Sequence, residues 1–300
     1  MGIRNAPFCF QSLLSAILSR VTFRFALVYM DDILVYSSTV EDHFSNLESV
    51  FQLLRDANLK LKLSKCTFGV DQTQYLGFTI NQSGISPSPD KVSAIKSFPR
   101  PKTKTNVRSF VGMAQFLQKS IQNFSHIARP LFQIMLPSTP FLWTPECQTA
   151  FGTLRFSALS NDDMLLYPDF QKHFLLVCDA SDISIRCALM QKDESGTLCP
   201  IAYSGRSLKP AETRYTILDR ELLAIVFAVK HFRVYLESAK FTVYTDHAAL
   251  KFLMTQKHRV QHLARWQIVL NNFDFDIVHV SGSTNTVSYT TLTLPTILSV

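Results

Sequence analysis

Two short apolar segments in the second half of the chain end at aspartates. Residues 174–178 are followed directly by Asp179, and residues 241–244 are followed by Thr245 and then Asp246. Apolar segments of this length predict buried strands. A long helix with a continuous apolar stripe is predicted between them, and Glu221 lies at its start. These acids are therefore all expected at the ends of elements.

The three acids lie 42 and 25 residues apart in the sequence, which is too far for local pairing. Only tertiary folding brings Asp179, Glu221 and Asp246 together. Clustered carboxylates repel and raise one another's pKa unless a cation lies between them, and two bound metal ions are a known device for hydrolysing phosphodiesters. Any one of these acids, taken alone, is more typical of a surface residue or a helix cap than of a metal ligand. For the three acids together, a metal site and three ordinary surface or capping residues are about equally supported.

A second acidic pair, Asp31–Asp32, lies within residues 21–35, which predict a β-hairpin hinged at the pair. Mg²⁺ prefers carboxylate oxygens, so adjacent aspartates at a hairpin tip indicate a possible cation site. An ordinary Asp-Asp turn is the alternative. An amphipathic helix is predicted directly afterwards, over residues 42–55.

Composition excludes several classes of protein. Apolar residues make up 47% of the 300 residues, enough for buried cores, and no apolar run reaches the length of a membrane span. The N-terminal residues lack the pattern of a secretory signal. The six cysteines include no C-x-x-C pair, which argues against a zinc cluster. We expect reduced thiols and an intracellular protein, in the cytoplasm or nucleus and not secreted.

The net charge is +7, and residues 91–108 carry six cations and no acid. This basic stretch is suited to contact a phosphate backbone, although a solvated helix face explains the charge equally well. Prolines bracket one short helix there, and a longer helix is predicted to follow with Thr105 as N-cap. A strand pair is predicted near residues 74–80, and residues 199–203 are predicted as the second strand of the C-terminal half.

Several motifs together resemble a known family. The runs NAPFCFQ, LVYMDDILVYS, YLGFTI, GISPSPDKVSAIKSFPRPKT and VRSFVGM resemble the palm and thumb of a gypsy-type long-terminal-repeat retrotransposon reverse transcriptase. The runs FLWTPECQTAF, LLVCDAS, PIAYSGRSL, DRELLAIVFAV, TDHAAL and FDFDIVHVSGSTN resemble the RNase H domain attached to it. The resemblance is collinear over nearly the whole chain.

The resemblance implies an α/β and α+β multidomain fold, with a truncated palm and thumb followed by a connection and an RNase H-like mixed-sheet domain. It implies a partial palm at residues 1–85, thumb-like helices at 86–136, a connection at 137–169, the RNase H-like domain at 170–285 and an uncharged tail at 286–300. It implies RNA-directed DNA polymerase and ribonuclease H activities, RNA–DNA hybrid or another nucleic acid as partner, and no membrane.

The resemblance also assigns site residues. Asp31 and Asp32 correspond to polymerase metal ligands, and Asp179, Glu221 and Asp246 to RNase H ligands, with two Mg²⁺ (or Mn²⁺) ions per active site. Asp219 is the nearest competitor of Glu221, which directly precedes Leu222 as the family's ligand does. The nucleic-acid contacts implied by the resemblance and the basic stretch are Gln11, Tyr29, Tyr75, Leu76, Gly77, Lys91, Lys96, Lys102, Lys104 and Arg108.

The chain departs from the family pattern in three places. It opens at the NAP motif, so we expect the fingers and the first polymerase aspartate to be absent. Ser184 and Arg186 replace small residues, mostly glycine, and an arginine there is expected to turn outward or strain the hairpin. Tyr289 stands in the place of the fourth RNase H acid. We therefore expect weak or no RNase H activity, with a non-catalytic nucleic-acid-binding relic as the alternative.

Overall fold

The computed structural model describes residues 5–157, 164–247 and 261–280. The chain divides into two compact units, Met1–Gln82 (unit 1) and Ser83–Val300 (unit 2). The sequence predicted five segments (palm, thumb, connection, RNase H-like domain and tail), whereas this division has only two units. The boundaries of the five segments therefore stay predictions. Among the described residues, no helix is both long and apolar enough to cross a membrane.

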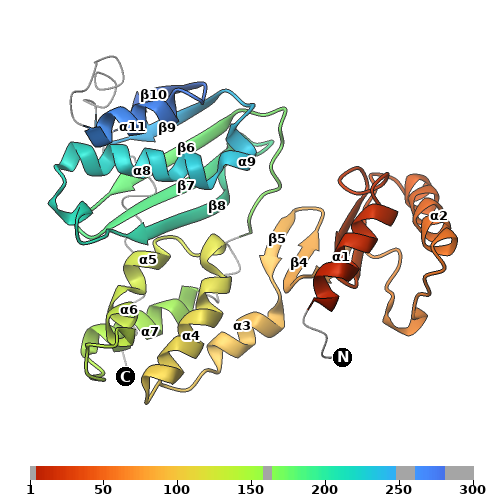
Figure 1. Cartoon of the computed structure of the whole chain (residues 1–300), viewed down its shortest axis with the longest axis horizontal. Coiled ribbons are helices and arrows are strands. Elements are labelled where there is room, and N and C mark those ends of the chain that lie inside the picture. The colour runs from red at the N-terminus through yellow and green to blue at the C-terminus, as the bar shows by residue number, and fades with distance from the viewer. Residues whose placement is uncertain (1–4, 158–163, 248–260, 281–300) are drawn as a thin grey trace. The chain divides into compact units, whose positions relative to one another are not determined.

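Unit 1 combines two antiparallel hairpins with two long helices (Figure 1). The hairpin predicted around the acidic pair is present, and so is the helix after it, whose N-cap Thr39 accepts a hydrogen bond from the Asp42 N–H at 3.1 Å. The core lies where this helix and the first helix of the unit pack on the first hairpin, around Leu14, Val50 and Leu54. In chain order the elements are α1 (Ala6–Ile17), β1 (Ala26–Tyr29), β2 (Asp32–Val35), α2 (Val40–Asp56), η1 (Leu63–Lys65), β3 (Gln72–Tyr75) and β4 (Phe78–Asn81).

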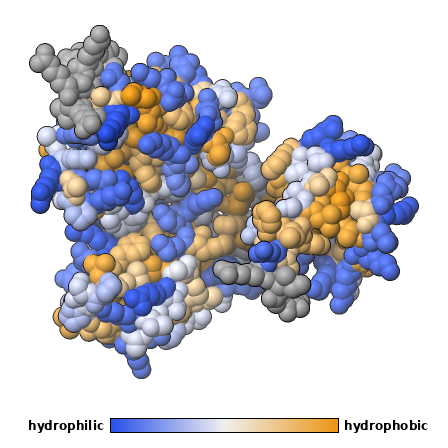
Figure 2. Space-filling view, in the orientation of Figure 1, coloured by the Kyte–Doolittle hydropathy of each residue, from blue (hydrophilic) through white to orange (hydrophobic). Residues whose placement is uncertain are grey.

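The first helix of unit 1, residues 6–17, leaves several apolar side chains at the surface. Phe8, Phe10 and Leu13 are 75%, 39% and 50% exposed, whereas Leu14 is buried. Figure 2 shows the apolar side chains gathered over α1. The described residues of unit 1 therefore bury only one side of this helix.

Unit 2 begins with β5 (Gly84–Pro87), which bridges Leu165, and continues into a bundle of helices that we call the helical part. Its core centres on Phe110, whose ring lies 5.4 Å from that of Phe98 and 4.6 Å from that of Phe151. The helical part comprises α3 (Pro89–Lys96), α4 (Lys104–Phe116), η2 (Gln118–Ser120), α5 (Phe124–Ile127), α6 (Arg129–Met135) and α7 (Pro145–Ser157).

The predicted N-cap of α4 is wrong by two residues. Thr103, with extended backbone (φ −143°), caps the helix by accepting a hydrogen bond from the Asn106 N–H at 3.1 Å. Thr105 lies inside the helix, where its carbonyl accepts from the Ser109 hydroxyl. Threonine is a favoured N-cap residue at either position. Thr103 takes the role because its own backbone is extended, whereas Thr105 already has helical backbone.

The rest of unit 2 is a five-stranded mixed sheet that we call the sheet domain, in the order β10-β9-β6-β7-β8. Strand β9 is parallel to both of its neighbours, β6 and β10. Strand β7 is antiparallel to both of its neighbours, β6 and β8. Helices α8 and α11 lie on one face of the sheet (Figure 1), where their apolar side chains share a core with it. The elements are β6 (Phe174–Ala180), β7 (Ser184–Lys192), β8 (Leu198–Ser207), η3 (Glu212–Arg214), α8 (Ile217–His231), α9 (Arg233–Leu236), β9 (Phe241–Thr245), α11 (Gln261–Leu270) and β10 (Phe275–His279).

The predicted strand order of the sheet domain needs one correction. The segment predicted as the second strand, residues 199–203, belongs to β8, and β7 comes between it and β6. Arg186, Gln191 and Lys192 interrupt the apolar pattern of β7, so the segment lacks the signal of a buried strand. The segment nevertheless forms a strand that pairs on both edges, because β6 and β8 supply hydrogen-bond partners for its backbone N–H and C=O groups.

The crowding between β7 and β8 gives a stability prediction with a matched control. A Cβ added at Gly205 would lie 2.7 Å from the Ile185 carbonyl oxygen, whereas one added at Gly112, on the exposed side of α4, meets nothing within 4 Å. We expect Gly205→Ala to lower the free energy of unfolding by about 1–3 kcal/mol. Gly112→Ala should raise it by up to about 1 kcal/mol, because alanine is the better helix former. Urea unfolding of both variants measures the difference, and equal effects would contradict the close approach at Gly205.

Candidate active site

The sheet places Asp179 and Asp246 at one edge. Strands β6 and β9 are parallel neighbours whose last pair in register is Val177 with Tyr244. Asp179 and Asp246 each lie two residues beyond that pair, so they leave the same end of adjacent strands. Asp179 is 4% exposed and Asp246 is half-buried. Their proximity follows from strand register alone.

Glu221 reaches this edge from the first turns of α8. It is 3% exposed, and its Oε1 accepts a hydrogen bond from the Ala180 N–H at 3.1 Å. Its Oε2 is buried and has no hydrogen-bond partner. One carboxylate oxygen from each of Asp179, Glu221 and Asp246 lies within 4.8 Å of the others. We call these three residues the acidic triad.

The competitor Asp219 is not part of the triad. Its backbone N–H donates to the N-cap hydroxyl of Thr216, and its carboxylate lies 3.9 Å from the His262 Nε2. Two residues along a helix change the direction of a side chain by about 200°. Glu221 therefore points toward the sheet edge, and Asp219 toward α11.

Burial dominates the electrostatics of the triad. Desolvation first, and then the negative charges of Asp179 and Asp246, raise the pKa of Glu221 to about 8. The pKa of Asp179 is also raised, chiefly by burial, with Arg186 acting in the opposite direction. Hard oxygen donors, one of them buried without a partner, form a donor set suited to a divalent cation such as Mg²⁺.

Arg186, which the sequence predicted to turn outward or strain the hairpin, turns inward. It lies directly across from Asp179 in the β6–β7 register, and its guanidinium forms an ion pair with the Asp179 carboxylate. The side chains are 16% and 5% exposed. A second guanidinium N–H donates to the Asn123 Oδ1 at 3.2 Å. The expectation failed because β7 was missed: residues paired across antiparallel strands share a face.

Ser184 is the other residue that replaces a small residue of the family pattern, and it is buried without strain. Its hydroxyl lies 3.1 Å from the Ser181 hydroxyl, and its backbone N–H donates to the same oxygen. Tyr289 and the predicted tail, residues 286–300, lie outside the described residues.

The first acidic pair lies at the tip of the β1–β2 hairpin in unit 1. Tyr29 pairs with Asp32 across the strands, so Met30 and Asp31 form the turn, with Met30 in the left-handed region at φ 52°. Both carboxylates are exposed. Exposed acids need no counter-ion, so this pair alone does not require a metal.

Gln11 holds this turn in place. Its Oε1 accepts a hydrogen bond from the Met30 N–H, and its Nε2 donates to the Val28 carbonyl at 3.3 Å and the Ser15 hydroxyl at 3.0 Å. The side-chain amide is thus engaged within unit 1. The predicted contact of Gln11 with nucleic acid stays a prediction, and its internal role was not predicted.

Tyr75, Leu76 and Gly77 form the turn between β3 and β4. Leu76 and Gly77 both have positive φ, 52° and 81°, which is the pattern of a two-residue hairpin turn. Burial, and second the charge of Asp32, raise the pKa of Tyr75. The side chain of Tyr75 therefore lies near the first acidic pair within unit 1.

The six cations of the basic stretch do not share one environment. The Lys104 ammonium donates to the Leu136 carbonyl at 2.7 Å, and Arg108 donates to the Met135 carbonyl at 3.4 Å, so both cap the end of α6. Lys91 lies over the ring of Phe116 and Arg100 over that of Trp143. Within the described part of the chain, the side chains of Lys96 and Lys102 have neither ion pair nor hydrogen bond. These two are the most available for phosphate.

Comparison with known families defines the class of protein. Residues 1–80 match the family described as reverse transcriptase (RNA-dependent DNA polymerase), and residues 169–273 match the RNase H-like domain found in reverse transcriptase. The chain therefore contains a reverse transcriptase segment and an RNase H-like segment, as its motifs predicted.

The similar curated proteins are transposon polyproteins. The chain is 36% identical over 288 residues to the retrovirus-related Pol polyprotein from transposon 297 of Drosophila melanogaster, covering 96% of this chain and 27% of the polyprotein. It is 32% identical to the transposon Tf2-3 polyprotein of Schizosaccharomyces pombe, covering 95% of this chain and 22% of the polyprotein. The chain thus spans about a quarter of the length of these relatives.

Solved structures of similar fold are foamy viral protease–reverse transcriptases. One in complex with double-stranded DNA has a TM-score of 0.80 at 23% identity, covering 93% of this chain and 50% of that chain. Another in complex with an RNA/DNA hybrid has a TM-score of 0.78 at 22% identity, covering 93% of this chain and 38% of that chain. The predicted fold class is thereby confirmed.

The buried triad predicts a pH-dependent stability in metal-free protein. Because folding raises the pKa of Glu221 from 4.5 to about 8, its neutral form is favoured in the folded state. The contribution of Glu221 to the free energy of unfolding is fully present below pH 4.5. It is lost as the pH rises from 4.5 through about 8, by at most about 1.4 kcal/mol per pH unit. Urea unfolding in EDTA across this range should show the fall, and Glu221→Gln should flatten it. An identical profile in the variant would contradict the assignment.

Proposed function

We propose that the sheet domain binds divalent cations through the acidic triad and hydrolyses the RNA strand of an RNA–DNA hybrid. The observation that carries the proposal is the convergence of Asp179, Glu221 and Asp246 within 4.8 Å, with one buried carboxylate oxygen unpartnered. The membership of residues 169–273 in the RNase H-like family supports the same reaction.

Each triad residue has a distinct task in this proposal. Asp179 and Asp246 project from rigid strand ends and present oxygens at a fixed spacing. The Ala180 N–H holds the Glu221 Oε1, so the Oε2 remains free to serve as a ligand. The three carboxylates would hold divalent cations, which would supply activated water and neutralise charge at the scissile phosphate. The apolar surroundings of Asp179 and Glu221 limit competition from bulk water.

The cleavage proposal predicts weak activity in the natural sequence, because Tyr289 replaces a fourth acid. In a hybrid carrying labelled RNA, with Mg²⁺ or Mn²⁺, we expect weak release by the wild type and none by Asp179→Asn. Tyr289→Asp should raise cleavage on the order of tenfold to hundredfold by restoring a metal-binding carboxylate. Tyr289→Phe is the matched control and should leave it unchanged. Strong wild-type cleavage that Tyr289→Asp does not improve would show the fourth acid to be dispensable.

We further propose that the basic stretch contacts the phosphate backbone of the hybrid. Lys96 and Lys102 carry this role, since the other four cations contact carbonyls or aromatic rings of the helical part. In unit 1, Asp31, Asp32 and the turn residues Tyr75, Leu76 and Gly77 retain the polymerase roles that family membership implies. The other proposed contacts, Gln11 and Tyr29, belong to the same region. An intracellular location stays part of the proposal.

The phosphate contacts predict a specific salt dependence. The logarithm of hybrid affinity should fall with the logarithm of salt concentration, and its slope should decrease by about 1 for each phosphate contact removed. We expect a decrease of about 2 in the Lys96→Ala, Lys102→Ala double variant. A double variant of Lys172 and Lys240, which pair with Asp169 and Asp276, should keep the wild-type slope. A slope equal in all three proteins would exclude the role of the basic stretch.

The second candidate is a nucleic-acid-binding relic without catalysis. The ion pair between Arg186 and Asp179 favours it, because it places a side-chain cation on a proposed metal ligand. Hybrid binding with no cleavage, in the wild type and in Tyr289→Asp, would support this alternative.

A further inference from the structure

Arg186 lies inside the site that the cleavage proposal assigns to metal. Among the described residues it is the one cation that forms an ion pair with a member of the acidic triad. The strand register sets Arg186 opposite Asp179, so the contact follows from the position of Arg186 on β7 and not from a mobile loop. Its side chain is only 16% exposed.

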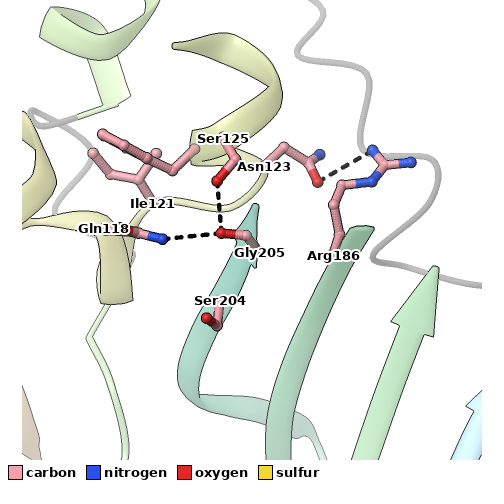
Figure 3. Close-up of a pocket in the computed structure, with 8 residues that line it drawn as sticks. Gln118, Ile121, Asn123, Ser125, Arg186, Ser204 and Gly205 are labelled. Carbon is pink, nitrogen blue, oxygen red and sulfur yellow. Dashed lines mark hydrogen bonds between the residues drawn. The ribbon is translucent and has the colours of Figure 1, made fainter. Parts of the chain in front are cut away.

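The helical part holds this arginine from the other side. Asn123, in the left-handed region at φ 59°, accepts a hydrogen bond from the guanidinium through its Oδ1. The segment around Asn123 is attached to β8, because Gln118 and Ser125 both donate to the Gly205 carbonyl, at 3.3 and 2.7 Å (Figure 3). The hollow among these residues measures only about 10 Å³, so it is a packed junction and not a ligand site.

The guanidinium is therefore fixed between a carboxylate and an amide at the edge of the triad. It occupies one of the two carboxylate oxygens of Asp179, and its positive charge repels a cation bound nearby. Its own Nε is buried without a partner, so Asp179 and Asn123 are the contacts that hold it. A metal ion at Asp179 would therefore compete with this ion pair.

We propose that Arg186 is a resident competitor for divalent metal at Asp179, and that Asn123 of the helical part keeps it there. The proposal rests on the metal site proposed above. It predicts a lowered metal affinity for this chain and attributes it to a residue other than Tyr289. It also makes the metal site sensitive to how the helical part packs on β7 and β8.

The test is a Mn²⁺ binding titration of the full chain without nucleic acid, followed by the electron paramagnetic resonance signal of free Mn²⁺. Arg186→Met removes the charge but keeps most of the aliphatic side chain. We expect it to bind Mn²⁺ at least about tenfold more tightly than the wild type, because the competing cation is gone. Arg220→Met is the matched control, since Arg220 is equally buried near the triad but pairs with Asp182. It should change the affinity far less.

Two further variants separate the possible results. Asn123→Ala releases Arg186 without altering any acid, so it should also tighten Mn²⁺ binding, by less than Arg186→Met, and it serves if Arg186→Met does not fold. Asp179→Asn in the Arg186→Met background should abolish the gain.

The outcomes distinguish this inference from the proposed function. Equal Mn²⁺ affinity in the wild type, Arg186→Met and Asn123→Ala, with loss in Asp179→Asn, would overturn the competition but keep the metal site. No Mn²⁺ binding by any folded variant would overturn the metal site itself. A similar gain in Arg186→Met and Arg220→Met would reduce the effect to net charge and would also overturn the inference.

Discussion

Burial of carboxylates at one edge of a sheet is the constraint on which the sheet domain depends. Asp179 and Glu221 are almost fully buried, although an isolated buried charge is expensive. The folded chain reduces that cost in three ways: a backbone N–H bonded to Glu221, a raised pKa that favours its neutral form, and an arginine paired with Asp179. A divalent cation would be a fourth, and it would replace the last two.

The same constraint connects the helical part to the sheet domain. Arg186 contacts Asp179 on one side and Asn123 on the other, and the Gly205 carbonyl takes hydrogen bonds from two residues of the helical part. Gly205 suits this junction because β8 passes so close to the Ile185 carbonyl that a side chain would collide with it. The electrostatics of the triad therefore depend on packing between two parts of the chain that are far apart in sequence.

Much of this arrangement could be predicted from local patterns. The apolar segments before Asp179 and Asp246 predicted β6 and β9, and the stripe after Glu221 predicted α8. The hairpin at Asp31–Asp32 was predicted because its apolar strands flank an obvious turn. The strand β7 was missed because polar residues break its pattern, and with it the pairing of Arg186 with Asp179 was missed as well. Likewise, the internal role of Gln11 left no signal, since a glutamine on a helix face has many possible partners.

By itself the sequence indicated most of the elements and the family resemblance, because hydrophobic periodicity depends only on neighbouring residues and collinear motifs depend only on their order. Tertiary structure decided which charges meet. Strand register set Asp179 beside Asp246 and opposite Arg186, and the packing of α8 chose Glu221 over Asp219. Interactions between charges fall off with distance and rise with burial, and neither distance nor burial is a property of the chain until it has folded.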